Sequence, residues 1–210
     1  MQRIIPLIAI ITLLTLPLNT KAQVGPAAQV GPPTAAMEAP TRLESLELRK
    51  SALIVKGYTE VGRVDGEEGS SITVSAIEMK DMSRGSHEMG LAIVATGGGD
   101  NRRSAVSYVD FDEITALLAA IDSLGKPDPE ATKLSAYEAQ YRTRSNLEFM
   151  SYDNNNQRMI SVRAVQVIFP SGELTWSTAQ FRLPMLPAIR KQISDAKDLL
   201  DKLREAAANK

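Results

Sequence analysis

The stretch SAVSYVDFDEITALLAAIDSL, residues 104–124, is the most informative part of this chain for its fold. Residues 104–109 are predicted to form a strand, and residues 114–124 carry an apolar stripe with the spacing of an amphipathic helix. At the transition between the two, three carboxylates lie within four residues: Asp110, Asp112 and Glu113. They form either the start of the helix or a site with metal or acid–base chemistry.

The helix-start interpretation gives these acids a structural role. With Asp110 at the N-cap position, its carboxylate accepts a hydrogen bond from the N–H of Glu113, and the Glu113 carboxylate accepts one from the N–H of Asp110. Negative charge in the first turn is also favourable because of the helix dipole. Gly125 follows the apolar stripe as a C-terminal stop signal. We therefore predict that Asp110 and Glu113 cap the helix.

A metal site at the same residues is less well supported by the pattern. Asp112 and Glu113 are adjacent, so their side chains diverge by about 100° around a helix. Calcium takes about six to eight oxygen ligands, and the stretch lacks the loop motif that supplies them. We expect no metal and no cofactor. A hydrolase that uses Asp110 and Asp112 is our third interpretation.

The composition gives little support for nucleophilic catalysis. The chain has no cysteine and a single histidine, His87. His87 lies between Ser86 and Glu88, and consecutive residues on one loop do not converge as the members of a catalytic triad do. We predict a surface loop position for His87 and no catalytic residue.

The N-terminal sequence indicates export. Residues 1–22 combine a positive charge at Arg3, an apolar run and small residues at Thr20 and Ala22, as is typical of a signal peptide that is cleaved after Ala22. Residues 23–41 are rich in Pro, Gly and Ala and predict a flexible spacer. We expect a periplasmic or extracellular protein with no membrane span after cleavage and no disulfides. An uncleaved membrane anchor is the alternative that the sequence leaves open.

The folded part is predicted as a single α+β domain at residues 42–210. Before the first helix we expect strands at residues 52–64, 71–79, 90–96 and 104–109. Before a second helix, which begins near residue 184, we expect strands at residues 137–145, 147–152, 159–169 and 174–181. The order ββββα thus occurs twice, in pseudo-repeats 42–126 and 133–207, and each half covers the other. A change of phase at Ile77 indicates a β-bulge.

Charge is unevenly distributed along the chain. The net charge is −1, yet residues 23–125 carry 9 Lys and Arg against 15 Asp and Glu, whereas residues 126–210 carry 13 against 10. The whole chain therefore lacks the positive field that attracts nucleic acid, and we expect no nucleic-acid partner. We assign the asymmetry to an acidic loop at residues 65–69 and to a basic set of strands.

Basic and aromatic residues of the second half indicate a binding face. Arg142 and Arg144 lie two apart on a predicted strand and should therefore share a face. Arg163 and Trp176 are expected on the strands that follow. Such a face would grip an acidic polymer or single-stranded nucleic acid, and the alternative is an ordinary solvated sheet surface.

The last helix is a candidate surface for a partner. Its apolar residues recur with the spacing 4, 3, 4, 3 of a coiled-coil seam, at Ile189, Ile193, Ala196, Leu200 and Leu203. The helix is also longer than the first one. We expect either a homodimer through this helix or a core helix with a frayed C-terminal end.

Two segments carry a resemblance to known proteins. SYVDFDEITALLAAIDSL and QYRTRSNLEFMSY resemble a loose set of uncharacterised exported bacterial proteins, which share a Tyr-x-Asp-x-Asp-Glu strand-to-helix motif and a later Tyr-x-Thr-Arg strand. That resemblance implies no established activity. The duplicated ββββα order also resembles the Whirly-type fold, whose binding of single-stranded nucleic acid is not carried over because of the signal peptide and the acidic balance.

These patterns together predict an exported, non-enzymatic binding or structural module. It would act by contact with a protein partner that the sequence does not identify. The alternative is an envelope protein that binds a polyanion through Arg142, Arg144 and Arg163, with Trp176 on the same face. The two differ in salt dependence, because binding to a polyanion weakens steeply as salt is added.

Overall fold

The computed structural model of the chain describes residues 41–100, 102–126, 131–134, 137–154, 157–168 and 173–209. All of them fall within one compact unit, Met37–Lys210. The predicted signal peptide and spacer lie outside the described residues, except for Thr41. No helix among the described residues is long and apolar enough to cross a membrane.

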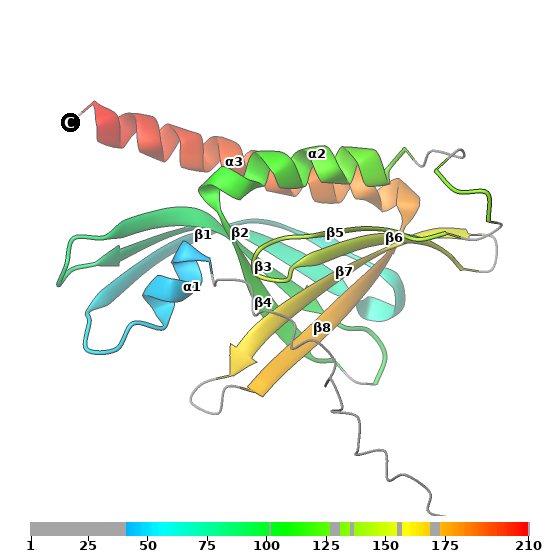
Figure 1. The fold of residues 1–210 in the computed structure, drawn as a ribbon, viewed down its shortest axis with the longest axis horizontal. Helices are drawn as coiled ribbons and strands as arrows, with labels where there is room; N and C mark the ends of the chain where they lie inside the picture. Colours follow the sequence, from blue (N-terminus) through cyan, green and yellow to red (C-terminus); the bar gives the residue numbers. More distant parts are fainter. Residues whose placement is uncertain are drawn as a thin grey trace, which may run out of the picture. The chain divides into compact units, whose positions relative to one another are not determined.

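The fold is α+β and contains the ββββα order twice, as predicted (Figure 1). The first unit comprises α1 (Arg42–Glu47), β1 (Ile54–Asp65), the short 3-10 helix η1 (Glu67–Gly69), β2 (Ser71–Asp81), β3 (His87–Thr96), β4 (Ser104–Asp110), η2 (Phe111–Glu113) and α2 (Ile114–Leu124). The second comprises β5 (Ala139–Arg142), β6 (Glu148–Asn154), β7 (Gln157–Ile168), β8 (Glu173–Arg182), η3 (Leu183–Met185) and α3 (Leu186–Ala208). Each unit forms a four-stranded antiparallel sheet with its strands in sequence order.

Each repeat supplies the helix that covers the other repeat's sheet. The helix α2 follows the first sheet but packs against β5 and β6, whereas α3 follows the second sheet and packs against β1, β2 and β3. The two helices contact each other and lie side by side on one side of the sheets (Figure 1). One hydrophobic core therefore contains residues of both sheets and both helices, and neither half can bury its sheet alone.

The helix α1 was not predicted, although its sequence carries a start signal. In residues 41–44, Thr41 accepts a hydrogen bond from the N–H of Glu44, and the Glu44 carboxylate accepts one from the N–H of Thr41. This is a capping box. The helix covers the face of the first sheet opposite α3, where Leu43 and Leu46 form a second small core with residues of β2 and β4.

The predicted bulge at Ile77 is wrong, and α1 explains the pattern that suggested it. β2 pairs with β3 without interruption from Ser71 to Lys80. The buried apolar side chains Ile72, Val74 and Ala76 face α3, whereas Ile77 and Met79 face α1. The phase of the hydrophobic pattern therefore changes because the covered face changes. The register shift of this sheet lies on the neighbouring strand β1, between Glu60 and Gly62.

Buried serine hydroxyls link the two sheets. Ser107 on β4 donates to the carbonyl of Val165 on β7 at 3.0 Å and accepts from its N–H at 2.9 Å. Ser70, between η1 and β2, makes the same pair of bonds with the backbone of Gln180 on β8, at 3.2 and 3.1 Å. Each hydroxyl thus satisfies strand-edge groups that would otherwise lack a partner.

The apolar seam of α3 is buried inside its own domain. Four of its five residues have no exposed surface, namely Ile189, Ile193, Ala196 and Leu200, because they pack on the first sheet. Only Leu203, beyond the sheet, is exposed, at 43%. The first four seam residues therefore belong to the core, but the helix continues to Ala208 and its C-terminal end is not frayed. The predicted homodimer through this helix stays a prediction.

Candidate functional site

The three clustered carboxylates do not cap α2. Asp110 is at the N-cap position of η2, but its side chain makes no capping hydrogen bond there. Its buried carboxylate instead accepts from the backbone N–H groups of Arg42 at 2.9 Å and Leu43 at 3.2 Å, in the first turn of α1. The predicted capping box of Asp110 with Glu113 is therefore wrong, because Asp110 caps a helix 68 residues upstream.

The alternation of side chains along β4 explains why Asp110 turns away from its own helix. Val109 points into the main core, so Asp110 and Tyr108 must point to the opposite face, where α1 lies. Gly90 on β3 lets α1 come close, because a Cβ there would lie 2.7 Å from the Leu43 side chain. With the capping box, Asp110 completes the hydrogen bonding of the first N–H groups of α1, which is only six residues long.

The other two acids bind Arg144, which lies in the turn between β5 and β6. The Glu113 carboxylate accepts from the backbone N–H of Arg144 at 2.8 Å and from its Nε at 3.3 Å. The Asp112 carboxylate accepts from Arg144 at 2.8 Å and from Arg42 at 2.7 Å. Partial burial raises the pKa of Asp112, but the hydrogen bond and charge of Arg144 and the charge of Arg42 outweigh it and leave that pKa below its ordinary value.

Of the four residues predicted for the basic face, Arg142, Arg163 and Trp176 lie on one face of the second sheet. β5 ends at Arg142, and the turn that follows directs Arg144 to the acids, so the two arginines do not share a face. Arg142 binds Glu148 at 2.6 Å, and Glu148 is in turn the cross-strand neighbour of Arg163. The guanidinium of Arg163 lies over the ring of Trp176, 5.4 Å from its centroid. A carboxylate thus lies between the two arginines that remain.

His87 begins the strand β3 and does not lie on a loop, contrary to the prediction. Its Nε2 lies 2.7 Å from a Glu78 carboxylate oxygen that also binds Lys80. A cleft of about 500 Å³ brings His87 and Asp112 to one surface, together with Arg42 and Arg204. Asp110 and Glu113 do not line it. In the parts of the chain that the structure describes, no three His, Cys, Asp or Glu side chains are grouped to hold a metal ion.

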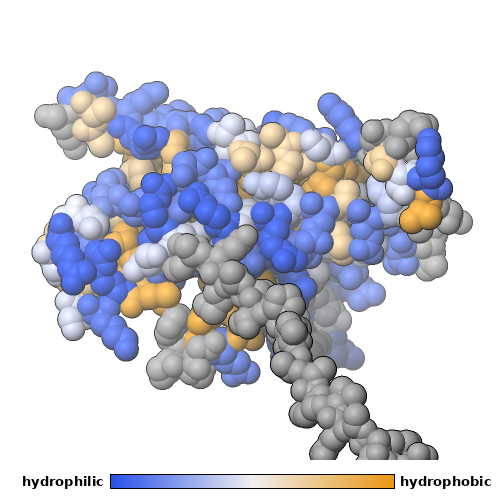
Figure 2. Space-filling model, viewed as in Figure 1, coloured by the Kyte–Doolittle hydropathy of each residue, from blue (hydrophilic) through white to orange (hydrophobic). Residues whose placement is uncertain are grey.

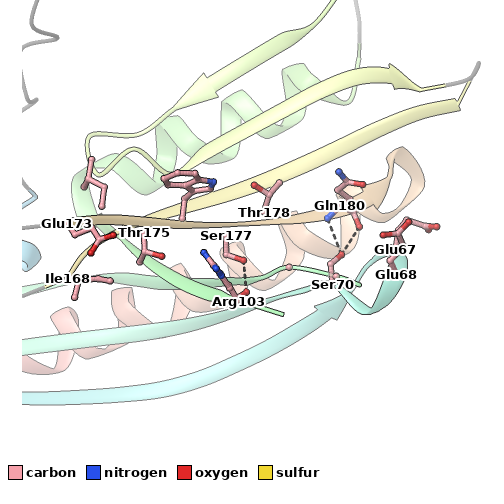
Figure 3. Close-up of a pocket in the computed structure, with 14 residues that line it drawn as sticks. Glu67, Glu68, Ser70, Arg103, Ile168, Glu173, Thr175, Ser177, Thr178 and Gln180 are labelled. Atoms are coloured by element: carbon pink, nitrogen blue, oxygen red, sulfur yellow. Dashed lines mark hydrogen bonds between the residues drawn. The ribbon is translucent and has the colours of Figure 1, made fainter. Parts of the chain in front are cut away.

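A larger groove runs along the free edge of β8, and we call it the β8 groove (Figure 3). Its volume is about 710 Å³. One side is β8 from Glu173 to Gln180, and the other is formed by η1 and the loop after β3. The bonds of Ser70 to Gln180 close one end, and the Ser177 hydroxyl donates to the carbonyl of Arg103 at 2.6 Å below the strand.

The backbone of β8 is open toward this groove. The N–H and C=O groups of Gln180 both bind Ser70, so they point away from β7. Backbone direction alternates along an antiparallel strand, so Thr178, Trp176 and Leu174 also point their N–H and C=O groups away from β7. These groups have no partner within the described residues. Trp176 and Leu174 are each 55% exposed.

Carboxylates outnumber basic groups around the β8 groove. Glu67, Glu68 and Glu173 line it, against Arg103 alone. Glu67 binds Arg182 at 3.1 Å, whereas the Glu68 carboxylate has no hydrogen bond or ion pair in the described part of the chain. The face shown in Figure 2 is mainly hydrophilic, and its apolar areas are small and separate. The groove therefore offers backbone groups and negative charge more than apolar area.

Sequence reasoning found Trp176 but not the groove around it. Trp176 was predicted to bind because aromatic residues lie among the arginines of the second half. The openness of β8 depends on the strand order of the second sheet and on how the first sheet lies beside it. The sequence carries no local signal for either. Comparison with models of known protein families finds no match, and a search of curated proteins also finds none.

Proposed function

We propose that this protein is an exported binding module that takes an extended segment of another protein into the β8 groove. The observation that carries the proposal is the open backbone of Leu174, Trp176 and Thr178 beside a groove of about 710 Å³. An extended peptide satisfies such groups by adding a strand to the sheet. The N-terminal sequence, which is typical of a signal peptide, supports the export part of the proposal.

The chemistry of the groove favours a partner segment with a basic residue. The free carboxylate of Glu68 would pair with a lysine or arginine of the segment. Main-chain hydrogen bonds would supply affinity along the five residues from Leu174 to Thr178, which span about 17 Å. The exposed ring of Trp176 would pack against an apolar side chain of the bound strand.

The other two interpretations have weaker support in the geometry. For a polyanion, Arg144 is already bound to carboxylates, and Glu148 lies between Arg142 and Arg163. For a hydrolase, the buried Asp110 carboxylate is already hydrogen-bonded to two backbone N–H groups. Asp112 lies between two arginines that favour its charged form. Neither acid is therefore arranged to accept a proton from a reacting group.

Selection from a library of random ten-residue peptides tests the proposal. We expect enriched peptides that contain lysine or arginine and residues with high strand propensity. Because Trp176 is the only tryptophan and lines the groove, its fluorescence should change in proportion to peptide bound. A library that yields no peptide above background, or peptides that leave the fluorescence unchanged, contradicts the proposal.

Two variants locate the site on the β8 edge. Thr178→Pro removes an outward N–H without touching the ladder with β7, and it should weaken the selected peptides at least tenfold. Glu68→Lys should weaken those that carry a basic residue. The matched controls make the same changes on β1, the edge strand of the first sheet, as Tyr58→Pro and Glu60→Lys, and should leave peptide affinity unchanged. Equal effects at both edges would place binding elsewhere.

A further inference from the structure

The first half of β1 is a second open strand edge, on the opposite sheet from the β8 groove. Met82 donates to the carbonyl of Leu53 at 2.9 Å, so Leu53 faces β2. By alternation the backbone groups of the even-numbered residues Ile54, Lys56, Tyr58 and Glu60 face away from β2. No hydrogen bond to these outward groups occurs within the described residues.

This edge carries few of the features that usually prevent strand pairing. Residues 54–60 contain no proline and pair with β2 without a register shift, which comes only after Glu60. Six of these seven residues are exposed, including Tyr58 at 75% and Val55 at 49%. Such a long, regular and exposed edge is a template for another strand.

We propose that two copies of this chain pair through residues 54–60 of β1 in antiparallel orientation, about a two-fold axis at Tyr58. An isologous interface requires a surface that is complementary to itself. With the axis at Tyr58, Lys56 of one copy lies opposite Glu60 of the other, and the same pair recurs on the other side of the axis. The result is two cross-strand ion pairs and one continuous eight-stranded sheet.

Charge selects this register over its neighbours. An axis at Gly57 places Lys56 opposite Tyr58 and leaves Glu60 opposite Ile54. An axis at Thr59 places Glu60 opposite Tyr58 and Lys56 opposite Gly62. Only the axis at Tyr58 pairs both charged residues with opposite charges, and opposite charges directly across two strands are favourable.

Both charged residues are able to make these contacts. Glu60 is exposed and has no hydrogen bond or ion pair among the described residues. Lys56 Nζ already contacts Glu47 at 2.7 Å and the Tyr108 hydroxyl at 2.6 Å. An ammonium group has three donors, so one remains for Glu60 of the second copy. The three side chains at positions 56, 58 and 60 also lie on one face of the strand.

Sedimentation of the purified chain without its predicted signal segment tests the pairing. We expect dimers that dissociate on dilution, and Glu60→Lys should raise the dissociation constant at least tenfold because both ion pairs become repulsive. Tyr58→Pro removes the outward N–H at the axis and should give monomers, with circular dichroism as the check that the fold is kept. Glu68→Lys, which makes the same charge change in the β8 groove, should not alter the dimer.

Cross-linking tests the register directly, since the chain has no cysteine. Under mild oxidation Tyr58→Cys should form a disulfide-linked dimer, because the two copies of position 58 face each other across the axis. Thr59→Cys should not, since position 59 faces position 57. A chain that stays monomeric up to about 100 μM overturns the proposal, as does a dimer that cross-links through Thr59→Cys but not Tyr58→Cys.

Discussion

Two strand-to-helix junctions occupy equivalent places in the two repeats and have almost the same backbone. Asp110 ends β4 with φ −63° and ψ 150°, and Arg182 ends β8 with φ −74° and ψ 146°. Each is followed by a three-residue 3-10 turn and then by the helix. Neither the Asp110 nor the Arg182 side chain caps the 3-10 turn that follows it. The turn therefore forms without acids in one repeat and does not use them for capping in the other.

What differs is the charge that each junction offers to a turn of the other repeat. At the first junction Asp112 and Glu113 bind Arg144 in the β5–β6 turn, and at the second Arg182 binds Glu67 in the β1–β2 turn. The serines repeat this relation, because the Ser145 hydroxyl donates to the carbonyl of Tyr108 and that of Ser70 to Gln180. The two junctions thus carry opposite charges, but each accepts a hydrogen bond from a serine hydroxyl of the other repeat.

This difference explains the uneven charge of the sequence more fully than an acidic loop does. Among the described residues, every ion pair between the repeats takes its acid from the first repeat and its base from the second. The pairs join Arg144 to Asp110, Asp112 and Glu113, Arg182 to Glu67, and Arg190 to Asp122. The asymmetry therefore reflects ion pairs between the repeats, which add to the shared hydrophobic core.

Asp110→Ala should have the largest effect at the junctions. It leaves two N–H groups of α1 without their buried charged acceptor, and we expect a loss of about 3 kcal/mol in the free energy of unfolding by urea. Arg182→Ala at the equivalent place should cost no more than about 0.5 kcal/mol, because its ion pair is exposed. Hydrogen exchange should show faster opening of α1 and not of α2. Equal losses for the two variants would contradict the assigned roles.

Ser70→Ala should have the next largest effect. Both backbone groups of Gln180 then lose their partner at a partly buried contact, at a cost of about 1–2 kcal/mol. Ser145→Ala removes one donor to Tyr108 and should cost about 1 kcal/mol. Thermal unfolding of both variants measures the difference, with Ser123→Ala on exposed α2 surface as the control. If Ser145→Ala lowers stability more than Ser70→Ala does, the expected order of the two serines is wrong.

Arg144→Gln should cost about 1 kcal/mol at low salt and less at high salt, since it removes a charge that pairs with three carboxylates, two of which keep Arg42. Arg182→Gln separates only one exposed pair and should cost less. Urea unfolding at two salt concentrations tests both. If salt leaves the Arg144→Gln loss unchanged, the interaction is not mainly electrostatic.

The smallest effect concerns pH. The pKa of Asp112 in the folded state lies below its unfolded value of 3.8, because the interactions with Arg144 and Arg42 outweigh partial burial. Its stabilising contribution is therefore complete above the unfolded pKa and is lost as the pH falls through the lower, folded pKa. Unfolding measured from pH 6 to pH 2 should show a shallower decline in Arg144→Gln than in the native chain. If the free energy of unfolding declines equally in both proteins, Asp112 does not contribute to the pH dependence of stability.

Local patterns predicted the fold well where one face of an element is buried continuously. The strand at residues 159–169 and the stripe of the helix at 114–124 correspond to β7 and α2. The sequence reasoning failed where two elements compete for one side chain. The capping motif at residues 110–113 was sound as a local pattern, but β4 directs Asp110 to α1, whose own capping box at Thr41 and Glu44 was overlooked.

The candidate site was much less predictable than the fold. Arg142 and Arg144 were placed on one face because a strand was expected to continue, yet β5 stops after four residues. Trp176 was predicted to bind as an aromatic residue, but it is a candidate because it lies on the open edge of β8 and lines the groove. An open edge is the absence of a neighbouring strand, and no residue type encodes that absence.

The sequence by itself determined the order of strands and helices, since hydrophobic period and turn residues act within a few positions of one another. It also determined that the first repeat is acidic and the second basic. Only the tertiary structure decided which amides Asp110 binds, which turn each junction meets, and which strand edges stay open. Those outcomes depend on contacts between residues about 30 to 110 apart, where packing and not local propensity sets the partner.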